Sequence, residues 1–434
     1  MGATSPKPGV LAVAVAILGL CLAPGPAAAQ DALRSDLDRA MRQAGPASGA
    51  YVAEGGRPLY ARGAGTPRVL ASNTKLFTTA AVLGRLGPDA TFETRALSAG
   101  APSGGVVAGN LYLRGGGDPA FGSAAFVRRA YGSGAASVET LAAQVRAAGV
   151  TRVTGAVVGD EALFDSRRGG PASGYRPSIY VGPLSALTFN RGLANPSGRA
   201  FQASPPAYSA GAFDRALERA GVSVASRPRA GRAPGGVTEV TKVSSPGLRR
   251  LAALTNKPSD NLFAEIVLKS LGARSGGGGT TAAGARQATV YARQRGASAR
   301  LVDGSGLSRG NRASPQAVVR LLEGMRSTPS FPAFFESLAV AGRDGTLRRR
   351  MTGGAARGNC RAKTGTLSGV STLSGYCRTR GGRNLSFSFL MNGVSPPAAR
   401  RLQDRMTEAV ARVGGSGATG ARSGGRSSAR RGGS

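Results

Sequence analysis

A serine and a lysine three residues apart are the first pair in this sequence whose types and spacing suit catalysis. Ser72 and Lys75 stand at the start of a helical pattern. Residues three apart lie on one face of a helix, so both side chains point into the same space. Unpaired backbone N–H groups of a first helical turn favour developing negative charge there. This arrangement suits a nucleophilic hydroxyl whose proton passes to an amine; an N-capping serine is the alternative.

The absence of histidine decides which base such a serine could use. Without histidine, Ser-His-Asp and Cys-His catalysis and histidine metal sites are excluded, and we expect no metal and no cofactor. A lysine acts as a base when burial or a nearby cation lowers the pKa of its ammonium group. Lysine is scarce, because 51 of the 57 basic residues are arginine, and the lysines are Lys7, Lys75, Lys242, Lys257, Lys269 and Lys363.

Two later clusters supply partners for this pair. Ser259-Asp260-Asn261 opens a helical segment, and Lys363-Thr364-Gly365 lies on the first strand of a β run. Ser259 can relay a proton to a leaving amine, because a hydroxyl both donates and accepts. All three motifs in this order arise by chance on the order of once in several hundred such chains. The predicted catalytic residues are therefore Ser72, Lys75 and Ser259.

The predicted binding residues come from the second and third motifs. Asn261 offers an amide to a peptide group of the substrate, while Lys363 and Thr364 suit a terminal carboxylate. Gly365 is expected to leave room for a substrate that lies along the strand edge. The backbone N–H groups of Ser72 and Thr366 are the simplest oxyanion hole. The substrate-binding set is Asn261, Lys363, Thr364, Gly365 and Thr366.

The order S-x-x-K, S-D-N and K-T-G is a known signature of penicillin-binding proteins and class A β-lactamases. The chain resembles the class C, type-4 penicillin-binding proteins, which are D-alanyl-D-alanine carboxypeptidases and endopeptidases. The resemblance implies a serine peptidase that forms an acyl-enzyme on Ser72, attacks D-Ala-D-Ala stems or D-Ala cross-links of peptidoglycan, and is acylated by β-lactams. It covers most of residues 50–395 and rests further on the segments 113–119, 159–165, 183–191, 303–308 and 344–347.

The same resemblance implies the fold. We expect an α+β protein with the serine β-lactamase/transpeptidase-like fold, a five-stranded antiparallel sheet flanked by helices, and an inserted β-rich domain. The insertion is shorter than the family leads us to expect, so one of its two inserted domains is predicted to be reduced or missing. The expected domains are a signal peptide at 1–29, a split peptidase domain at 30–92 and 240–413, an insertion at 93–239, and a disordered basic tail at 414–434.

Two other functions remain open at this point. A class A-like β-lactamase shares the S-D-N form of the second motif, but the chain holds no Glu-x-x-Leu-Asn, and Ser259 stands 187 positions after Ser72. The second alternative is a non-catalytic cell-wall-binding protein on a former hydrolase fold. The complete set of motifs argues against it. Asp118, Asp160 and Asp303 stand next to Gly or Pro, which favours turn roles over acid-base or metal roles.

The first 29 residues predict export. An apolar run at 10–23 is followed by Ala27-Ala28-Ala29, typical of a cleaved secretion signal. We therefore expect the periplasm or the extracytoplasmic cell-wall space. Cleavage leaves Cys360 and Cys377, which in an exported chain predict one disulfide. Their midpoint falls between Ser368 and Gly369, so a two-residue turn there would place the cysteines opposite each other. Such a bridge stabilises by about 3 kcal/mol.

The formal net charge of +35 is the last feature of the sequence to explain. We expect no nucleic-acid partner, because the arginines are scattered, aromatic residues make up 5% of the chain, and no nucleic-acid motif occurs. A basic exported protein is suited to anionic surroundings. The tail at 414–434 has no acidic residue, and anionic wall polymers or a membrane surface are its expected partners.

Overall fold

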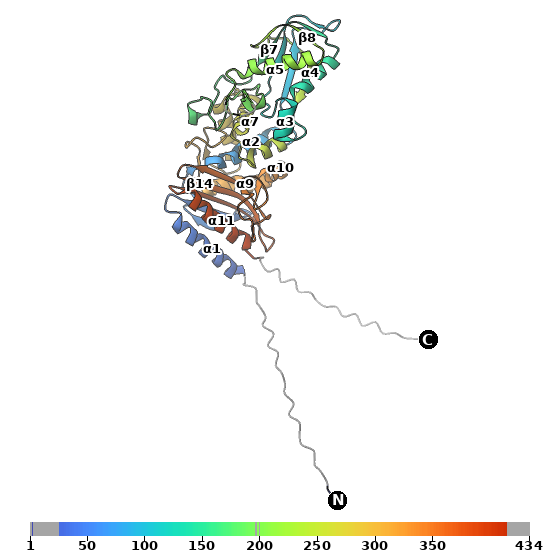
Figure 1. Cartoon of the computed structure of the whole chain (residues 1–434). Coiled ribbons are helices and arrows are strands. Elements are labelled where there is room, and N and C mark those ends of the chain that lie inside the picture. Colours follow the sequence, from blue (N-terminus) through green and yellow to red (C-terminus); the bar gives the residue numbers. More distant parts are fainter. Residues whose placement is uncertain (1, 3–25, 196–197, 199, 415–434) are drawn as a thin grey trace, which may run out of the picture.

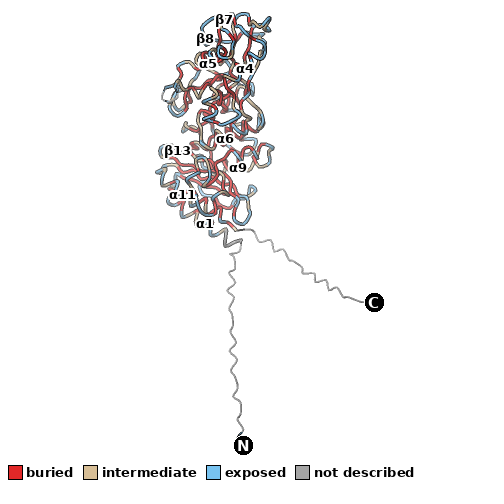
Figure 2. Tube along the Cα trace, turned by 45° about the vertical axis from the view of Figure 1, so that its right-hand side comes forward, coloured by how far each residue is buried: buried red, intermediate tan, exposed pale blue. Residues whose placement is uncertain are grey.

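The computed structural model describes residues 2, 26–195, 198 and 200–414. Most of the predicted signal segment and nearly all of the predicted basic tail lie outside these residues. The described chain is elongated, with one sheet and its helices at each end and a helical layer between them (Figure 1). Its interior is filled with buried residues along the whole length (Figure 2). In the described part, no helix combines the length and the apolar character needed to cross a bilayer.

The main sheet has six antiparallel strands in the order β12-β13-β14-β15-β1-β2. Five are long, as predicted, and the sixth is a two-residue edge strand. Strand β1 pairs with β15, so the two ends of the peptidase part share one sheet. The α+β transpeptidase-like fold is confirmed. The bounds are β1 Gly49–Glu54, β2 Arg57–Arg62, β12 Ala339–Val340, β13 Cys360–Leu367, β14 Val370–Arg378 and β15 Asn384–Asn392.

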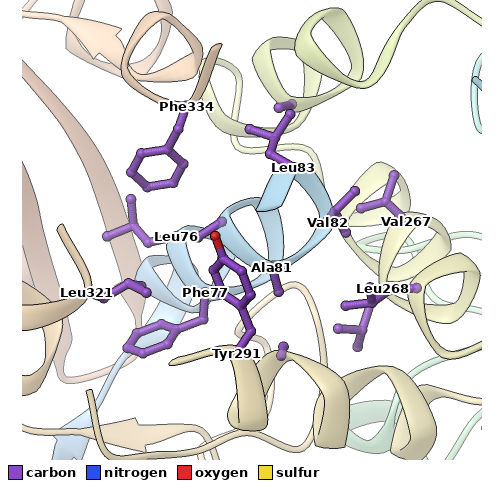
Figure 3. Close-up of a cluster of buried hydrophobic side chains, with 14 of the residues drawn as sticks. Leu76, Phe77, Ala81, Val82, Leu83, Val267, Leu268, Tyr291, Leu321 and Phe334 are labelled. Atoms are coloured by element: carbon purple, nitrogen blue, oxygen red, sulfur yellow. The ribbon is translucent and has the colours of Figure 1, made fainter. Parts of the chain in front are cut away.

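Helices cover both faces of this sheet, as predicted. Helices α1 and α11 pack on one face, and α9 packs on the other, the face nearer to α2 (Figure 1). Helix α2 is surrounded by apolar side chains from α7, α8, α9 and α10, including Val267, Tyr291, Leu321 and Phe334 (Figure 3). The bounds are α1 Pro26–Gln43, α2 Thr74–Leu86, α6 Leu248–Asn256, α7 Asn261–Arg274, α8 Thr281–Arg293, α9 Pro315–Arg326, α10 Phe331–Ser337 and α11 Pro396–Arg412.

The predicted disulfide is confirmed. Cys360 and Cys377 are bonded and face each other in the register of β13 and β14. The turn between these strands consists of Ser368 and Gly369, and Gly369 has a φ of 69°, which favours glycine. The hairpin thereby fixes the strand that carries the third motif.

A second sheet is built from the residues between the first two motifs. Its order is β5-β7-β6-β4-β9, with β8 also on β7. Strand β7 pairs in parallel with β5, β6 and β8, and helices α4 and α5 pack on the sheet, so the insertion is a mixed α/β unit rather than a β-rich one. The bounds are β4 Glu93–Ser98, β5 Val106–Val107, β6 Leu111–Arg114, α3 Ala124–Tyr131, α4 Val138–Ala147, β7 Arg152–Asp160, α5 Pro205–Arg219, β8 Ser223–Ala230 and β9 Thr238–Ser244.

The chain enters and leaves the insertion on neighbouring strands. Strand β4 pairs with β9, with Glu93 opposite Ser244, and Ser245 hydrogen-bonds the backbone of Phe92. A long insertion can therefore leave the peptidase part undisturbed. The exact domain boundaries, and the reduction of one of the family's inserted domains, stay predictions. The remaining elements are β3 Arg68–Val69, β10 Ala299–Arg300 and β11 Arg312–Ala313, which form a small sheet, and the 3₁₀ turns η1 Ala71–Asn73, η2 Pro171–Ser173, η3 Asn190–Gly192 and η4 Gly345–Leu347.

Candidate active site

Ser72 lies in the 3₁₀ turn η1, directly before helix α2 rather than inside its first turn. The preceding Ala71 has a φ of 45°, a left-handed conformation that is costly for a residue with a side chain. The Ser72 hydroxyl caps no helix end and faces a cleft of about 860 Å³. Ser259, Asn261, Thr364 and Gly365 line the same cleft, which therefore brings together all three motifs.

Lys75 is fully buried beneath the serine. Its Nζ donates to Ser72 Oγ over 3.1 Å, to Asn261 Oδ1 over 2.7 Å and to the Ser305 carbonyl over 2.6 Å. Burial lowers the pKa of Lys75 to about 8, although the charges of Asp303, Asp260 and Glu265 oppose this shift. About a tenth of Lys75 is then neutral at pH 7.

The partners of Lys75 determine where its lone pair points once it is neutral. A neutral amine has two N–H donors and one lone pair. The Asn261 Oδ1 and Ser305 carbonyl oxygens only accept hydrogen bonds, so they take the two donors. The lone pair is left to face Ser72 Oγ, the third and longest contact. The geometry thus makes the neutral lysine a base directed at the serine hydroxyl.

The second motif begins with a strained residue. Ser259 has a φ of 64°, and Asp260, not Ser259, caps helix α7 by accepting from Phe263 N over 3.0 Å. The hydroxyl of Ser259 is therefore free for the cleft, where it accepts from Lys363 Nζ over 2.8 Å. Asn261 is held at both ends of its amide, because its Nδ2 donates to the Tyr180 carbonyl over 3.0 Å.

The third motif lies on β13 at the edge of the cleft. Lys363 is fully buried and donates to the Thr364 carbonyl over 2.9 Å. Burial, and then the charge of Lys75, hold the pKa of Lys363 well below its usual range. The Thr364 and Thr346 hydroxyls are hydrogen-bonded at 2.8 Å, and both line the cleft.

Gly365 has a packing role that the sequence did not indicate, and its predicted role of leaving room for substrate stays a prediction. A β-carbon at this position would lie 2.2 Å from Thr372 Oγ1 and 2.9 Å from the backbone nitrogen of Ser72. The missing side chain therefore lets β13 approach η1. This close approach sets the distance between the third motif and Ser72.

Two buried carboxyl groups lie near Lys75, and the sequence did not indicate one of them, Glu265. Glu265 Oε1 accepts from the backbone N–H groups of Gly304 and Ser305, at 3.1 and 2.8 Å. Its other oxygen is buried without a partner, and burial raises the pKa of Glu265 to about 7. Asp303 accepts from the N–H groups of Gly306 and Ser308, which agrees with a turn role, and burial raises its pKa. The one sequence signal for Glu265 was an acidic residue among the apolar residues of α7.

The insertion also reaches the site, which the sequence did not indicate. Arg191 pairs with Asp260 Oδ2 at 2.6 Å, behind the second motif. Asn190 and Arg191 both have positive φ values, at 49° and 61°, so the backbone here is held in an uncommon conformation. Together with the Tyr180 carbonyl on Asn261, this contact ties the insertion to the catalytic side chains.

The other two aspartates considered from the sequence accept hydrogen bonds from the backbone two residues further on, which agrees with the expected turn and loop roles. Asp118 accepts from Ala120 N at 2.8 Å, and burial raises its pKa to about 7. Asp160 accepts from Ala162 N at 2.9 Å and pairs with Arg114. Within the described ranges, no three Cys, Asp or Glu side chains cluster in a way that could hold a metal ion.

Comparisons with known proteins agree with this site. The profile of the family described as D-Ala-D-Ala carboxypeptidase 3 (S13) matches residues 33–203 and 190–413. The chain belongs to this family. A D-alanyl-D-alanine carboxypeptidase of Actinomadura sp. (strain R39) is 32% identical over 88% of this chain and 85% of its own length. The carboxypeptidase DacB of Mycolicibacterium smegmatis is 34% identical over 79% of this chain and 75% of its own length.

Solved structures show the same fold. The crystal structure of penicillin binding protein 4 (dacB) from Haemophilus influenzae superposes with a TM-score of 0.72. The superposition covers 87% of this S13 family member and 99% of the Haemophilus influenzae chain, at 19% sequence identity. At this identity the likeness concerns the fold alone, and the function rests on the site and the family.

Proposed function

We propose that this protein is a serine D-Ala-D-Ala carboxypeptidase with endopeptidase activity, acting on peptidoglycan stem peptides and cross-links. The observation that carries the proposal is the environment of Lys75. A buried amine whose two donors are occupied can only direct its lone pair at Ser72. Family membership supports the choice of substrate class.

The reaction follows from this geometry. Ser72 Oγ attacks the carbonyl carbon between the two D-alanines, and Lys75 takes its proton. Backbone N–H groups of Ser72 and Thr366 are the proposed donors to the oxyanion. The C–N bond breaks, and the leaving amine receives a proton relayed through Ser259, which Lys363 holds in place. Water then hydrolyses the ester on Ser72 and regenerates the serine.

Lys363, Thr364 and Thr366 are proposed to bind the carboxylate of the leaving residue. The two threonines line the cleft beside Ser72, and Lys363 lies beneath them. Asn261 is proposed to bind the peptide group of the substrate, a role that its contacts with Lys75 and Tyr180 would orient. A β-lactam mimics the same substrate and would acylate Ser72.

The products of defined muropeptides test this function. Incubation with a pentapeptide stem should release a single D-Ala, and a cross-linked dimer should yield monomers, both identified by mass. The Ser72→Ala variant is the control. If neither substrate changes, or if the Ser72→Ala variant gives the same products, the proposed activity is wrong.

A class A-like β-lactamase is the competing enzyme, and one observation disfavours it. Among the described residues that line the cleft, Asp404 is the one carboxylate, and Arg350 binds it. No free carboxylate in this set is available to activate water against an acyl-enzyme. Nitrocefin should therefore be turned over slowly, with a long-lived acyl-enzyme, whereas fast turnover would favour the lactamase. A non-catalytic wall-binding protein would show no covalent label at all.

Export to the periplasm or the extracytoplasmic cell-wall space agrees with a family whose substrate is the cell wall. The segment 414–434 carries arginines and no acidic residue, and we keep anionic wall polymers or a membrane surface as its proposed partners. Retention on isolated cell walls should then fall with added salt, and a chain ending at residue 414 should lose this salt-sensitive retention. Equal retention of both chains would reject this role.

A further inference from the structure

The active-site cleft continues beyond the third motif into a region that the proposed mechanism does not use. This end is lined by Thr346 of η4, by the following Arg350, and by Arg400, Arg401 and Asp404 of α11. Three guanidinium groups therefore face one carboxylate. The excess positive charge lies on the same side of the cleft as the proposed carboxylate clamp.

The charge and the hydrogen-bond donors of Arg350 are satisfied by other residues of the protein. It donates to Asp404 Oδ1 over 2.9 and 2.7 Å, to Gln403 Oε1 over 3.3 Å and to the Arg400 carbonyl over 3.4 Å. These contacts hold the first turns of α11 against the loop after η4. The pair neutralises Asp404, so this carboxylate does not balance the other two arginines.

Arg400 and Arg401 are exposed and pair with no carboxylate among the described residues. Exposed arginines are common in this chain and usually need no explanation. These two differ because they line the cleft, and because Arg400 donates to Thr366 Oγ1 over 3.1 Å. The arginines thus adjoin the residues that are proposed to hold the leaving group.

The unpaired edge of β13 indicates the direction in which a bound peptide substrate would run. Strand β12 pairs only with Ala362 and Arg361, so in the described sheet the edge from Lys363 to Leu367 has no partner on that side. An extended peptide could add there, at about 3.3 Å per residue. A single D-Ala as leaving group would end at Thr364 and Thr366. A longer leaving group would continue towards Arg400 and Arg401.

We propose that Arg400 and Arg401 form a subsite for a second carboxylate on the leaving part of the substrate. This inference rests on the proposed function and specifies its substrate class. The preferred substrate is a cross-linked peptide whose leaving stem carries free carboxylates beyond the cleavage point. A leaving stem whose carboxylates are amidated would bind without the charge interaction with Arg400 and Arg401.

The test compares two cross-linked muropeptide dimers that differ only in the leaving stem, one with free carboxylates and one amidated there. For the unmodified protein, kcat/KM is expected to be higher for the free-carboxylate dimer. The ratio of the two kcat/KM values should fall about tenfold in the double variant Arg400→Gln/Arg401→Gln, at about threefold for each exposed charge pair. Arg405→Gln, on the same helix outside the cleft, is the matched control and should leave the ratio unchanged.

Salt dependence gives a second measurement on the unmodified protein. Cleavage of the free-carboxylate dimer should fall more steeply with added NaCl than cleavage of the amidated dimer. An unchanged ratio in the double variant, an equal loss on both dimers, or identical salt dependences would overturn the subsite. Labelling of Ser72 by fluorescent penicillin separates the two hypotheses, because a protein that labels but fails these tests keeps the proposed function and loses only the subsite.

Discussion

At the scale of single residues, catalysis in the proposed mechanism depends on the protonation of Lys75. Its ammonium form donates to Ser72, Asn261 and Ser305 and cannot take a proton. Its neutral form has the lone pair directed at Ser72. Burial lowers the pKa of Lys75 to about 8, which brings the neutral form within reach at neutral pH.

The pH dependence of acylation follows from this pKa. Because the reactive form is the unprotonated one, the second-order rate constant should rise with pH and level off above about 8. Below that value the rise should approach about tenfold per pH unit. Stopped-flow acylation by a fluorescent penicillin between pH 6 and 9.5 measures it. A rate that is flat or that falls over this range contradicts a lysine base.

Glu265 is expected to act on Lys75 through charge and position. Its carboxylate raises the pKa of Lys75, and its Oε1 fixes the Ser305 backbone whose carbonyl binds Nζ. Glu265→Gln keeps an oxygen acceptor and removes the charge. The midpoint of the pH profile should therefore move to lower pH. The exposed Glu336→Gln is the control, and a midpoint shared by both variants would refute this role.

The sequence predicted which residues would meet at the candidate site, but not the buried groups that support them. Spacing and the lack of histidine restrict the choice of base, and on this ground the sequence predicts Ser72, Lys75, Ser259 and Lys363. Glu265 lies within an apolar helical segment, where a single acidic residue has no distinguishing pattern. Its importance comes from contacts with residues about 40 positions away, which only the fold creates.

At the scale of elements, the hairpin of β13 and β14 controls the distance between motifs. Its disulfide and its turn at Ser368-Gly369 were predictable, because cysteine positions and period-two pairing define the register. The role of Gly365 was not predictable. The sequence could show a glycine on a strand edge, but not which neighbour its missing side chain would touch.

Gly365→Ala tests this close approach. The new β-carbon would meet Thr372 Oγ1 and the Ser72 backbone nitrogen, so β13 or η1 must shift. Acylation should fall about 100-fold, because small misplacements of reacting groups are costly. Rates of penicillin labelling and thermal unfolding measure the two effects. Gly235→Ala, whose β-carbon meets open space, is the control; labelling of Gly365→Ala at the unmodified rate would reject the role.

At the scale of the whole molecule, the insertion is part of the active site as well as a separate sheet. Its presence followed from the separation of 187 positions between Ser72 and Ser259. Its mixed α/β character did not follow from the sequence. Sequence periodicity cannot tell parallel from antiparallel pairing of short strands such as β5 and β6. The contact of Arg191 with Asp260 joins distant segments and leaves no local pattern.

Arg191→Gln tests the coupling between insertion and site. The variant removes the ion pair behind the second motif and leaves Asp260 to cap α7 alone. It should lower the free energy of unfolding by about 2 kcal/mol and slow acylation. Urea unfolding and penicillin labelling measure both. Arg152→Gln, an exposed arginine of the same insertion, is the control, and a variant equal to it in both respects would show that the contact carries no coupling.

The most direct test of the central claim is to locate the acyl group. The protein is incubated with a β-lactam, digested, and mapped by peptide mass spectrometry. The expected result is one β-lactam per chain, bound to Ser72, with no adduct in Ser72→Ala and a strongly reduced yield in Lys75→Met. An adduct on another residue, or equal labelling of the Ser72→Ala variant, would contradict the assignment of Ser72 as the nucleophile.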